Sequence, residues 1–173
     1  MDNILIIYST VDGHTKSICE RIKTSVGNSA SVKLIPLEST KKEMIEQADT
    51  IVIGASIRYG KHRPSLFSFI NKHMNILKTK KSAFFSVNIV ARKEHKNTHE
   101  TNPYVIKFLN LTEWRPDILD VFAGRLDFPK YGFLDKYIIK FIMWITNGPT
   151  DTTKSYEFTA WDRVDAFAKK LVA

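Results

Sequence analysis

A hydroxyl-rich turn that follows a short apolar run carries the clearest chemistry in this sequence. Residues 4–8 are apolar, and the next seven are Ser-Thr-Val-Asp-Gly-His-Thr, ahead of a helical pattern. Backbone N–H groups at a helix N-terminus, nearby hydroxyls and the positive end of the helix dipole bind phosphate without a lysine. No Gly-Lys-Ser/Thr follows, and Gly13 is alone, which excludes a Walker loop and the dinucleotide fingerprint. The turn therefore predicts the phosphate site of a mononucleotide, for which flavin mononucleotide (FMN) is the usual ligand. An ordinary strand-to-helix turn with a capping threonine is the alternative.

Two more segments are expected at the same place, because ligands of an open parallel sheet bind beyond the carboxyl ends of its strands. They are residues 54–60, Gly-Ala-Ser-Ile-Arg-Tyr-Gly, and residues 86–92, Ser-Val-Asn-Ile-Val-Ala-Arg. We expect Ile57 and Tyr59 to pack on the flavin ring, and backbone amides of both loops to bond its pyrimidine edge. A cation at Arg58 would favour the anionic reduced flavin. A surface aromatic at Tyr59 and a solvated charge at Arg58 are the alternatives.

The predicted FMN contacts come from all three segments. They are Ser9, Thr10, Val11, Asp12, Gly13, His14, Thr15, Ser56, Ile57, Arg58, Tyr59, Gly60, Ser86, Val87, Asn88, Ile89, Val90 and Ala91.

The composition narrows the class of partner. The chain has 173 residues, enough for one domain over 1–173 with a core of its own, and 26 Lys and Arg against 18 Asp and Glu give a net charge of +8. A basic surface favours nucleic acid, anionic lipid or a carboxylated small molecule. The aromatic residues are not interleaved with the basic ones on an evident strand platform, so we expect no nucleic-acid partner.

Cysteine and histidine usage argues against other chemistries. Cys19 is the only cysteine and falls in the pattern of the first helix, which predicts a buried small hydrophobe rather than a disulfide or a reactive thiol. The histidines, His14, His62, His73, His95 and His99, show no metal-ligand spacing, so we expect no metal. The N-terminal apolar run is too short for a signal peptide, and we expect a cytoplasmic protein without a membrane span.

Strand and helix patterns alternate along the chain. Strands are expected over 3–8, 31–37, 50–55, 82–88 and 118–123. A helix is expected over about 14–26. Capping patterns at 40–43 and 159–162 predict the starts of two more helices, and Pro64 and Pro103 predict the starts of another two. This alternation predicts an α/β fold with a doubly wound, five-stranded parallel sheet of order 2-1-3-4-5. The second strand alternates in polarity and carries Pro36, which places it at an edge.

Residues 125–158 form a predicted insertion before the last helix. The stretch from Lys130 to Asn147 would be one helix with an apolar arc of eight residues, Phe133, Leu134, Tyr137, Ile138, Phe141, Ile142, Trp144 and Ile145. Asp135, Lys136, Lys140 and Asn147 gather on the other side, which Ile139 and Met143 interrupt. Aromatics and lysines around an apolar arc predict a helix lying in a membrane interface. Packing of that arc on the protein's own core is the alternative.

Five segments resemble one family. Residues 8–15 are similar to the flavodoxin phosphate signature. Residues 54–60, 86–93, 114–117 (Trp-Arg-Pro-Asp) and 150–152 (Thr-Asp-Thr) resemble the bacterial flavodoxin-like, quinone-dependent protoporphyrinogen IX dehydrogenases. The resemblance implies a flavodoxin-like fold, FMN, a membrane quinone (menaquinone or ubiquinone) as acceptor, and association with the inner face of the cell membrane. It also implies oxidation of protoporphyrinogen IX to protoporphyrin IX in haem biosynthesis.

A porphyrinogen carries two propionates, which suits the basic residues of these loops. The candidates for substrate contact are Arg58, Lys61, Arg63, Arg92 and Lys93, and the arginines are favoured because a guanidinium holds a carboxylate bidentately. No general base is identified. An NAD(P)H-dependent FMN quinone reductase and an electron-transfer flavodoxin remain as alternatives, and an oligomer is compatible with the sequence.

Overall fold

The computed structural model describes residues 1–173 and is built on a five-stranded parallel sheet of order β2-β1-β3-β4-β5. The strands are β1 (Asn3–Ser9), β2 (Ser31–Pro36), β3 (Thr50–Ser56), β4 (Lys81–Asn88) and β5 (Ile118–Ala123). The predicted strands, their order and the flavodoxin-like fold class are confirmed. The apolar runs of β1, β3 and β4 are buried on both faces, whereas β2 alternates in burial as an edge strand does.

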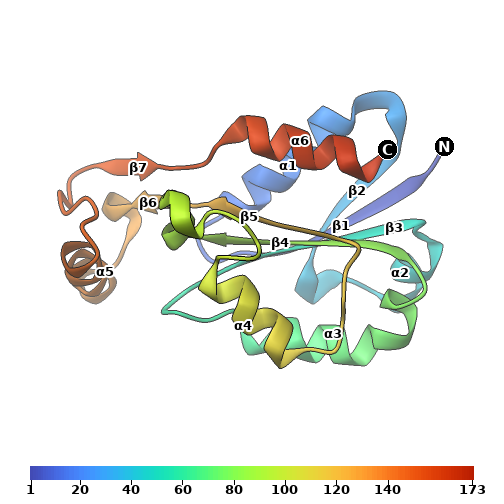
Figure 1. Ribbon diagram of the computed structural model, residues 1–173, viewed down its shortest axis with the longest axis horizontal. Helices are drawn as coiled ribbons and strands as arrows, with labels where there is room; N and C mark the ends of the chain where they lie inside the picture. The colour runs from blue at the N-terminus through green and yellow to red at the C-terminus, as the bar shows by residue number, and fades with distance from the viewer.

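Helices cover both faces of the sheet (Figure 1). On one face lie α1 (His14–Val26) and α6 (Trp161–Leu171), and on the other α2 (Lys42–Gln47), α3 (Pro64–Leu77) and α4 (Pro103–Leu111). Short 3-10 turns connect them: η1 (Gly27–Ser29), η2 (Leu37–Ser39), η3 (Ile89–Arg92) and η4 (Glu94–Lys96). As predicted, α3 and α4 begin with proline, which has no N–H to leave unpaired at that position.

The predicted side-chain caps of α2 and α6 are wrong. Neither helix has a side-chain cap, and each begins two residues after its threonine. The Thr40 hydroxyl donates to the Pro36 carbonyl, and the Thr159 hydroxyl donates to the Ala123 carbonyl at the end of β5. Thr40 thus bonds a carbonyl four residues back in the chain, and Thr159 bonds one on a distant strand, so neither hydroxyl caps its helix.

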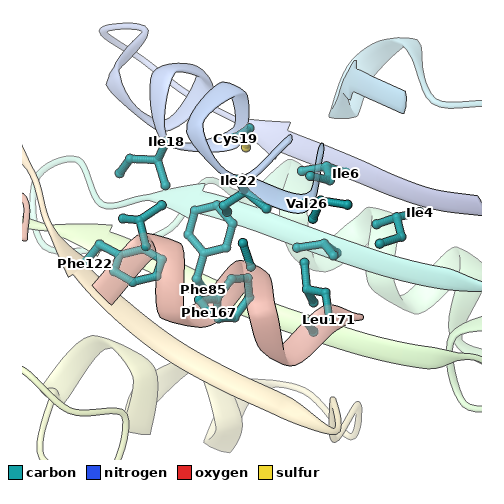
Figure 2. Packing of buried hydrophobic residues seen from close by; sticks show 14 of the residues in the cluster. Ile4, Ile6, Ile18, Cys19, Ile22, Val26, Phe85, Phe122, Phe167 and Leu171 are labelled. Carbon is teal, nitrogen blue, oxygen red and sulfur yellow. The ribbon is translucent and has the colours of Figure 1, made fainter. Parts of the chain in front are cut away.

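The core under α1 and α6 is a cluster of sixteen buried hydrophobic residues (Figure 2). Cys19 is a fully buried member of this cluster, and burial raises the pKa of its thiol. The predicted burial of Cys19 as a small hydrophobic side chain is therefore confirmed. Gly54 in β3 allows this packing, since a Cβ there would lie 2.2 Å from the Phe85 ring.

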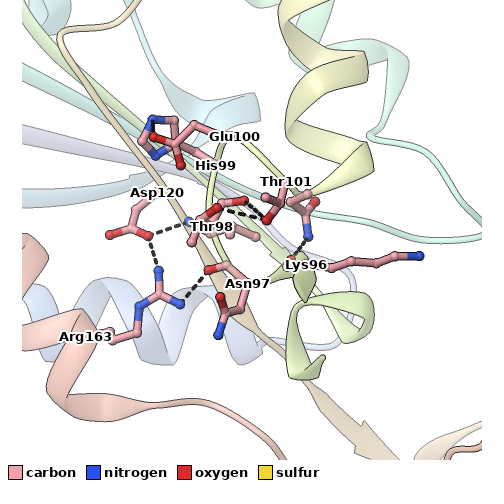
Figure 3. Close-up of polar contacts among 10 residues, drawn as sticks. Lys96, Asn97, Thr98, His99, Glu100, Thr101, Asp120 and Arg163 are labelled. Carbon is pink, nitrogen blue, oxygen red and sulfur yellow. Dashed lines mark hydrogen bonds and ion pairs between the residues drawn. The ribbon is translucent and has the colours of Figure 1, made fainter. Parts of the chain in front are cut away.

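Residues between β4 and α4 are fixed to the sheet by an arginine of α6 (Figure 3). Arg163 donates to the Asp120 carboxylate of β5 and to the Asn97 carbonyl, both at 2.6 Å. This segment directly follows β4, so the two contacts help to hold the β4 loop in place.

After β5 the chain leaves the sheet and builds a small subassembly. It contains β6 (Arg125–Asp127), η5 (Phe128–Lys130), α5 (Phe133–Ile145) and β7 (Ser155–Glu157), with β6 and β7 antiparallel. Figure 1 shows α5 at one end of the molecule, reached through β6 and β7. No helix of the protein has the length and apolar character needed to span a bilayer.

The face of α5 that packs on the protein is the side that carries Asp135, which the sequence predicted to be the polar side. Ile139 and Met143 are its buried residues, packed with Leu126, Phe128 and Tyr131. The eight residues of the apolar arc are exposed, from 38% for Ile138 to 80% for Phe133. The alternative in which this arc packs on the protein's own core is therefore wrong.

Candidate functional site

The turn between β1 and α1 offers unpaired donors. Gly13 has a φ of +87°, a conformation that favours glycine, and its N–H donates to the Thr10 hydroxyl at 3.0 Å. α1 has no side-chain cap, so no side chain occupies the N-terminus of the helix. The Thr15 hydroxyl is buried without any hydrogen-bond partner. A buried hydroxyl without a partner is rare and points to an acceptor supplied by a ligand, so the turn fits a bound phosphate.

Two adjoining hollows open at the carboxyl ends of the strands. The first lies against the turn and is lined by Thr10, Val11, Asp12, His14, Thr15, Ser56, Ile57, Val87, Asn88, Ile89, Gly124 and Arg125. The second, which we call the main cavity, has a volume of about 390 Å³ and is mostly apolar. It is lined by Asp12, Ile57, Arg58, Tyr59, Gly60, Asn88, Ile89, Val90, Tyr104, Arg125, Leu126, Tyr131, Ile139, Ile142 and Met143. The three segments singled out in the sequence therefore meet at one place.

An ion-pair clasp joins the phosphate turn, the β3 loop and α5. Arg58 donates to the Asp12 carboxylate at 2.7 Å and to the Asp135 carboxylate at 3.0 Å, and the Tyr59 hydroxyl donates to Asp135 as well. Partial burial lowers the pKa of Arg58, but Asp12, Tyr59 and Asp135 outweigh this and raise it. The hydrogen bond from Tyr59, together with Arg58, holds the pKa of Asp135 below its ordinary value. Arg58 is therefore a paired charge in the cavity wall, and the alternative of a solvated charge is wrong.

The second end of α5 is fastened by Arg92. Its guanidinium donates to the Ile89 carbonyl and to the Thr146 carbonyl, both at 3.1 Å, and burial lowers its pKa. α5 is thus tied to the β3 loop near its first turn and to the β4 loop just after its last.

The remaining predicted residues lie around the hollows rather than in their walls. Ser9 and Ser86 are buried, and Gly13 and Ala91 line neither of the two hollows. Of the basic residues, Arg63 pairs with Glu38, Lys61 lines a separate cavity, and Lys93 lines neither hollow.

Sequence reasoning missed the contribution of the segment after β5. Gly124 and Arg125 line the first hollow, and Arg125 and Tyr131 line the main cavity. The signal was present, because the carboxyl end of β5 lies beside that of β4 in the predicted order. No group of three or more His, Cys, Asp or Glu side chains is placed to hold a metal.

His14 in the phosphate turn has a defined hydrogen-bonding role. The Thr159 hydroxyl donates to the Ala123 carbonyl, so it accepts from His14 Nε2, 2.6 Å away. Burial lowers the pKa of His14 although Glu157 acts to raise it, which favours a neutral ring at neutral pH.

Comparison with known proteins agrees with the fold and the site. A family model of the flavodoxin domain matches residues 5–153. A protoporphyrinogen IX dehydrogenase (quinone) of Leishmania major is 40% identical over 171 residues, covering 98% of this chain and 74% of the relative. The protein of that name from Escherichia coli K12 is 41% identical over 170 residues, covering 96% of this chain and 93% of the relative.

The solved structures give the fold alone. Flavodoxin 1 from Bacillus cereus superposes with a TM-score of 0.55 at 14% identity, covering 98% of this chain and 97% of that one. Given the flavodoxin-domain match and the two curated relatives, the chain belongs to the flavodoxin-domain family and, within it, to the family of the quinone-dependent protoporphyrinogen IX dehydrogenases.

Proposed function

We propose that this protein is an FMN-dependent protoporphyrinogen IX dehydrogenase that passes electrons to a membrane quinone, menaquinone or ubiquinone, in haem biosynthesis. The observation that carries the proposal is the junction of the two hollows. A turn with an unpaired buried hydroxyl opens into an apolar cavity that α5 closes on one side. The names of the relatives point to the same reaction.

The residues of the three loops would hold FMN. The phosphate would take the donors of residues 9–15, with the Thr15 hydroxyl among them. The ring would lie among the apolar side chains of the main cavity, with Ile57, Tyr59 and Ile89 in contact. Bound FMN would supply two-electron redox chemistry between the porphyrinogen and the quinone. The protein's own part is to position both partners, exclude water and balance charge.

The substrate propionates would meet the basic residues named above, of which Arg58 lines the main cavity. Arg58 holds the carboxylates of Asp12 and Asp135, and in this scheme a propionate takes the place of Asp135 on the same guanidinium. Replacing Asp135 would loosen α5, so substrate binding and helix position are coupled in this scheme. Arg125 gives a second cation in the same wall, paired with Asp127 at 3.3 Å.

The overall reaction balances without another oxidant. Conversion of the porphyrinogen to the porphyrin removes six electrons and six protons, and three quinones take them up to give three quinols. Release of each quinol returns the protein to its starting state, so the acceptor must reach the flavin region three times per porphyrin.

We further propose that α5 attaches the protein to the inner face of the cytoplasmic membrane. The stretch from Lys130 to Asn147 exposes eight large apolar side chains, with lysines beside them, on a chain of net charge +8. An exposed apolar arc of this size is unusual on a soluble monomer, and aromatics with lysines suit an anionic interface. The quinone also resides in the membrane, which makes a lipid surface the expected partner rather than a second copy of the chain.

Membrane attachment is tested with anionic vesicles of phosphatidylglycerol and phosphatidylcholine. Phe141→Glu, in the exposed arc, should abolish co-sedimentation, whereas Ile106→Glu, at an exposed apolar site of α4, should leave it unchanged. Equal loss in both variants, or dimers at working concentration that the Phe141→Glu change dissolves, would contradict the membrane role.

The activity is tested anaerobically with FMN-loaded protein, protoporphyrinogen IX and menadione, followed by porphyrin fluorescence. We expect fluorescence to rise only when FMN and quinone are both present. A flat trace with bound FMN, together with rapid menadione reduction by NADPH, would favour a general quinone reductase instead. A stable one-electron reduced flavin without either turnover would favour an electron-transfer flavodoxin.

A further inference from the structure

A second cavity lies between α3 and α4 and adjoins the main cavity. It has a volume of about 300 Å³, within the range of small-molecule sites, about 300–1,000 Å³. Ile57 and Tyr104 line both cavities, so the two cavities share part of their walls. Phe67 and Phe108 make the interior aromatic, while the exposed Lys61 and Lys107 also line it.

One buried polar side chain in this wall is left with a free ring nitrogen. His62 is 6% exposed, and its only hydrogen bond joins Nε2 to the Ser86 hydroxyl at 3.0 Å. Its Nδ1 has no partner within the protein, and the ring is packed edge-on against Phe67, Phe84 and Phe108. Nδ1 itself is not fully buried, so it is free to bond a ligand that enters the cavity.

The hydrogen bonds behind His62 determine which nitrogen carries the proton. The Ala91 N–H can only donate, and it donates to Asn88 Oδ1, which fixes the orientation of that amide. Asn88 Nδ2 then faces Ser86 and donates to its hydroxyl oxygen at 3.2 Å. The Ser86 proton is left to donate to His62 Nε2, since the side chain is fully buried and has no other acceptor. His62 must therefore carry its proton on Nδ1.

The ring is also kept neutral. Burial lowers the pKa of His62 to about 4, with Lys107 acting in the same direction. The charged groups lining the cavity are Lys61 and Lys107, with no carboxylate beside them. The cavity thus combines aromatic walls, one neutral N–H donor and two nearby cations. These features suit a planar apolar ring with a carbonyl oxygen on which negative charge develops.

We propose that this cavity binds the ring of the quinone acceptor, with His62 Nδ1–H donating to one quinone carbonyl oxygen. The proposal rests on the quinone-dependent function proposed above and assigns a place to its acceptor. Each quinone takes two electrons from the reduced flavin and two protons from solvent to become a quinol. The N–H bond of His62 polarises the carbonyl and stays intact, and the two lysines stabilise charge on the oxygen before it is protonated.

The tautomer and the binding are measured first on the unaltered holoprotein. Long-range ¹H–¹⁵N spectra of histidine-labelled protein should show His62 protonated on Nδ1 at neutral pH. Menadione should then shift the His62 signals while those of His73, a buried histidine of α3 outside the cavity, stay in place. A proton on Nε2, or a menadione titration that leaves His62 unchanged, would overturn the proposal.

Two variants carry the test into kinetics. His62→Phe removes the donor and keeps an aromatic ring, so the KM for menadione should rise about two- to tenfold, the range for one lost hydrogen bond. The KM for protoporphyrinogen should not change. His73→Phe, the matched control, should change neither. A shift in the porphyrinogen KM alone would show that the cavity serves the other substrate and would refute the assignment.

The two proposals fail in different ways. If menadione shifts His62 but porphyrinogen is never oxidised, the quinone site stands and the proposed reaction is wrong. If porphyrin forms with menadione as acceptor while His62 does not respond, the reaction stands and this site is wrong.

Discussion

The buried Thr15 hydroxyl gives the sharpest test of the phosphate turn. Thr15→Val replaces it by a methyl group of similar shape. The apoprotein should become more stable by about 1–3 kcal/mol, because a buried hydroxyl without a partner carries that cost. A hydrogen bond to a charged phosphate contributes about 1.5–3 kcal/mol, so the Kd for FMN should rise roughly tenfold to a hundredfold. The two effects have opposite signs.

Both quantities are measured on the same preparations. Urea unfolding of the apoprotein gives the free energy of unfolding, and quenching of flavin fluorescence gives the Kd. Thr24→Val is the matched control, since Thr24 is an exposed threonine of the same helix that bonds the Glu20 carbonyl. It should leave the FMN Kd unchanged. Loss of apoprotein stability with an unaltered Kd for Thr15→Val would refute the reasoning, because the hydroxyl would then serve the fold alone.

Three further predictions concern α5 and the core. Asp135→Asn should speed FMN release severalfold by weakening the clasp to Arg58, and lowering the pH should do the same. The pKa of Asp135 is lower in the folded protein than its ordinary value of 3.8. The clasp is therefore intact above pH 3.8 and is lost as the pH falls through the lowered pKa. Stopped-flow measurement of the FMN release rate at a series of pH values follows this loss. Gly54→Ala should destabilise the protein by about 1–3 kcal/mol in urea, because its Cβ would collide with the Phe85 ring. Ile139→Ala, in the cavity wall, should speed FMN release without affecting vesicle binding, whereas Ile138→Ala, on the exposed side, should do the reverse; parallel effects in both assays would contradict the two-sided helix.

The sheet could be predicted from the sequence because each strand has a local signature. β1, β3 and β4 are short, nearly continuous apolar runs, which are typical of parallel strands buried on both faces. β2 alternates in burial, which is typical of an edge strand. The phosphate turn was equally local, since strand, glycine and hydroxyls follow one another. The strand order then brought the loops together by a general rule about carboxyl edges.

The clasp could not be predicted, because it joins residues far apart in the chain. Asp12 lies 46 residues and Asp135 lies 77 residues from Arg58. In the sequence each of the three has the pattern of an ordinary surface charge, and only folding brings them together at the main cavity. The failed cap of α6 has the same cause, since the Thr159 hydroxyl bonds a carbonyl of β5 rather than a group of its own helix.

The helical wheel of α5 grouped the residues correctly and left open which side faces the protein. Asp135, Ile139 and Met143 are spaced four apart, so they form one stripe. The stripe begins with the carboxylate that meets Arg58 and continues with Ile139 and Met143, two of the three α5 side chains that line the main cavity. A wide apolar arc would bury more area on the protein, but it has no carboxylate to match the cation in that wall. The charge at Arg58 thus selects the narrow stripe, and the wide arc is left outward as a consequence.

This orientation connects the site to its surroundings. A helix that lines the main cavity with Ile139, Ile142 and Met143 and exposes the rest of its apolar arc would bring that cavity to any surface the arc binds. The cavity between α3 and α4 adjoins the main cavity at Ile57 and Tyr104, so an acceptor dissolved in the bilayer would have a short path to the flavin region. If a propionate took the place of Asp135 at Arg58, the same contact that orients α5 would also respond to the substrate. On the proposed function, one ion pair would then link substrate binding, the closing of the cavity and the position of the protein on the membrane.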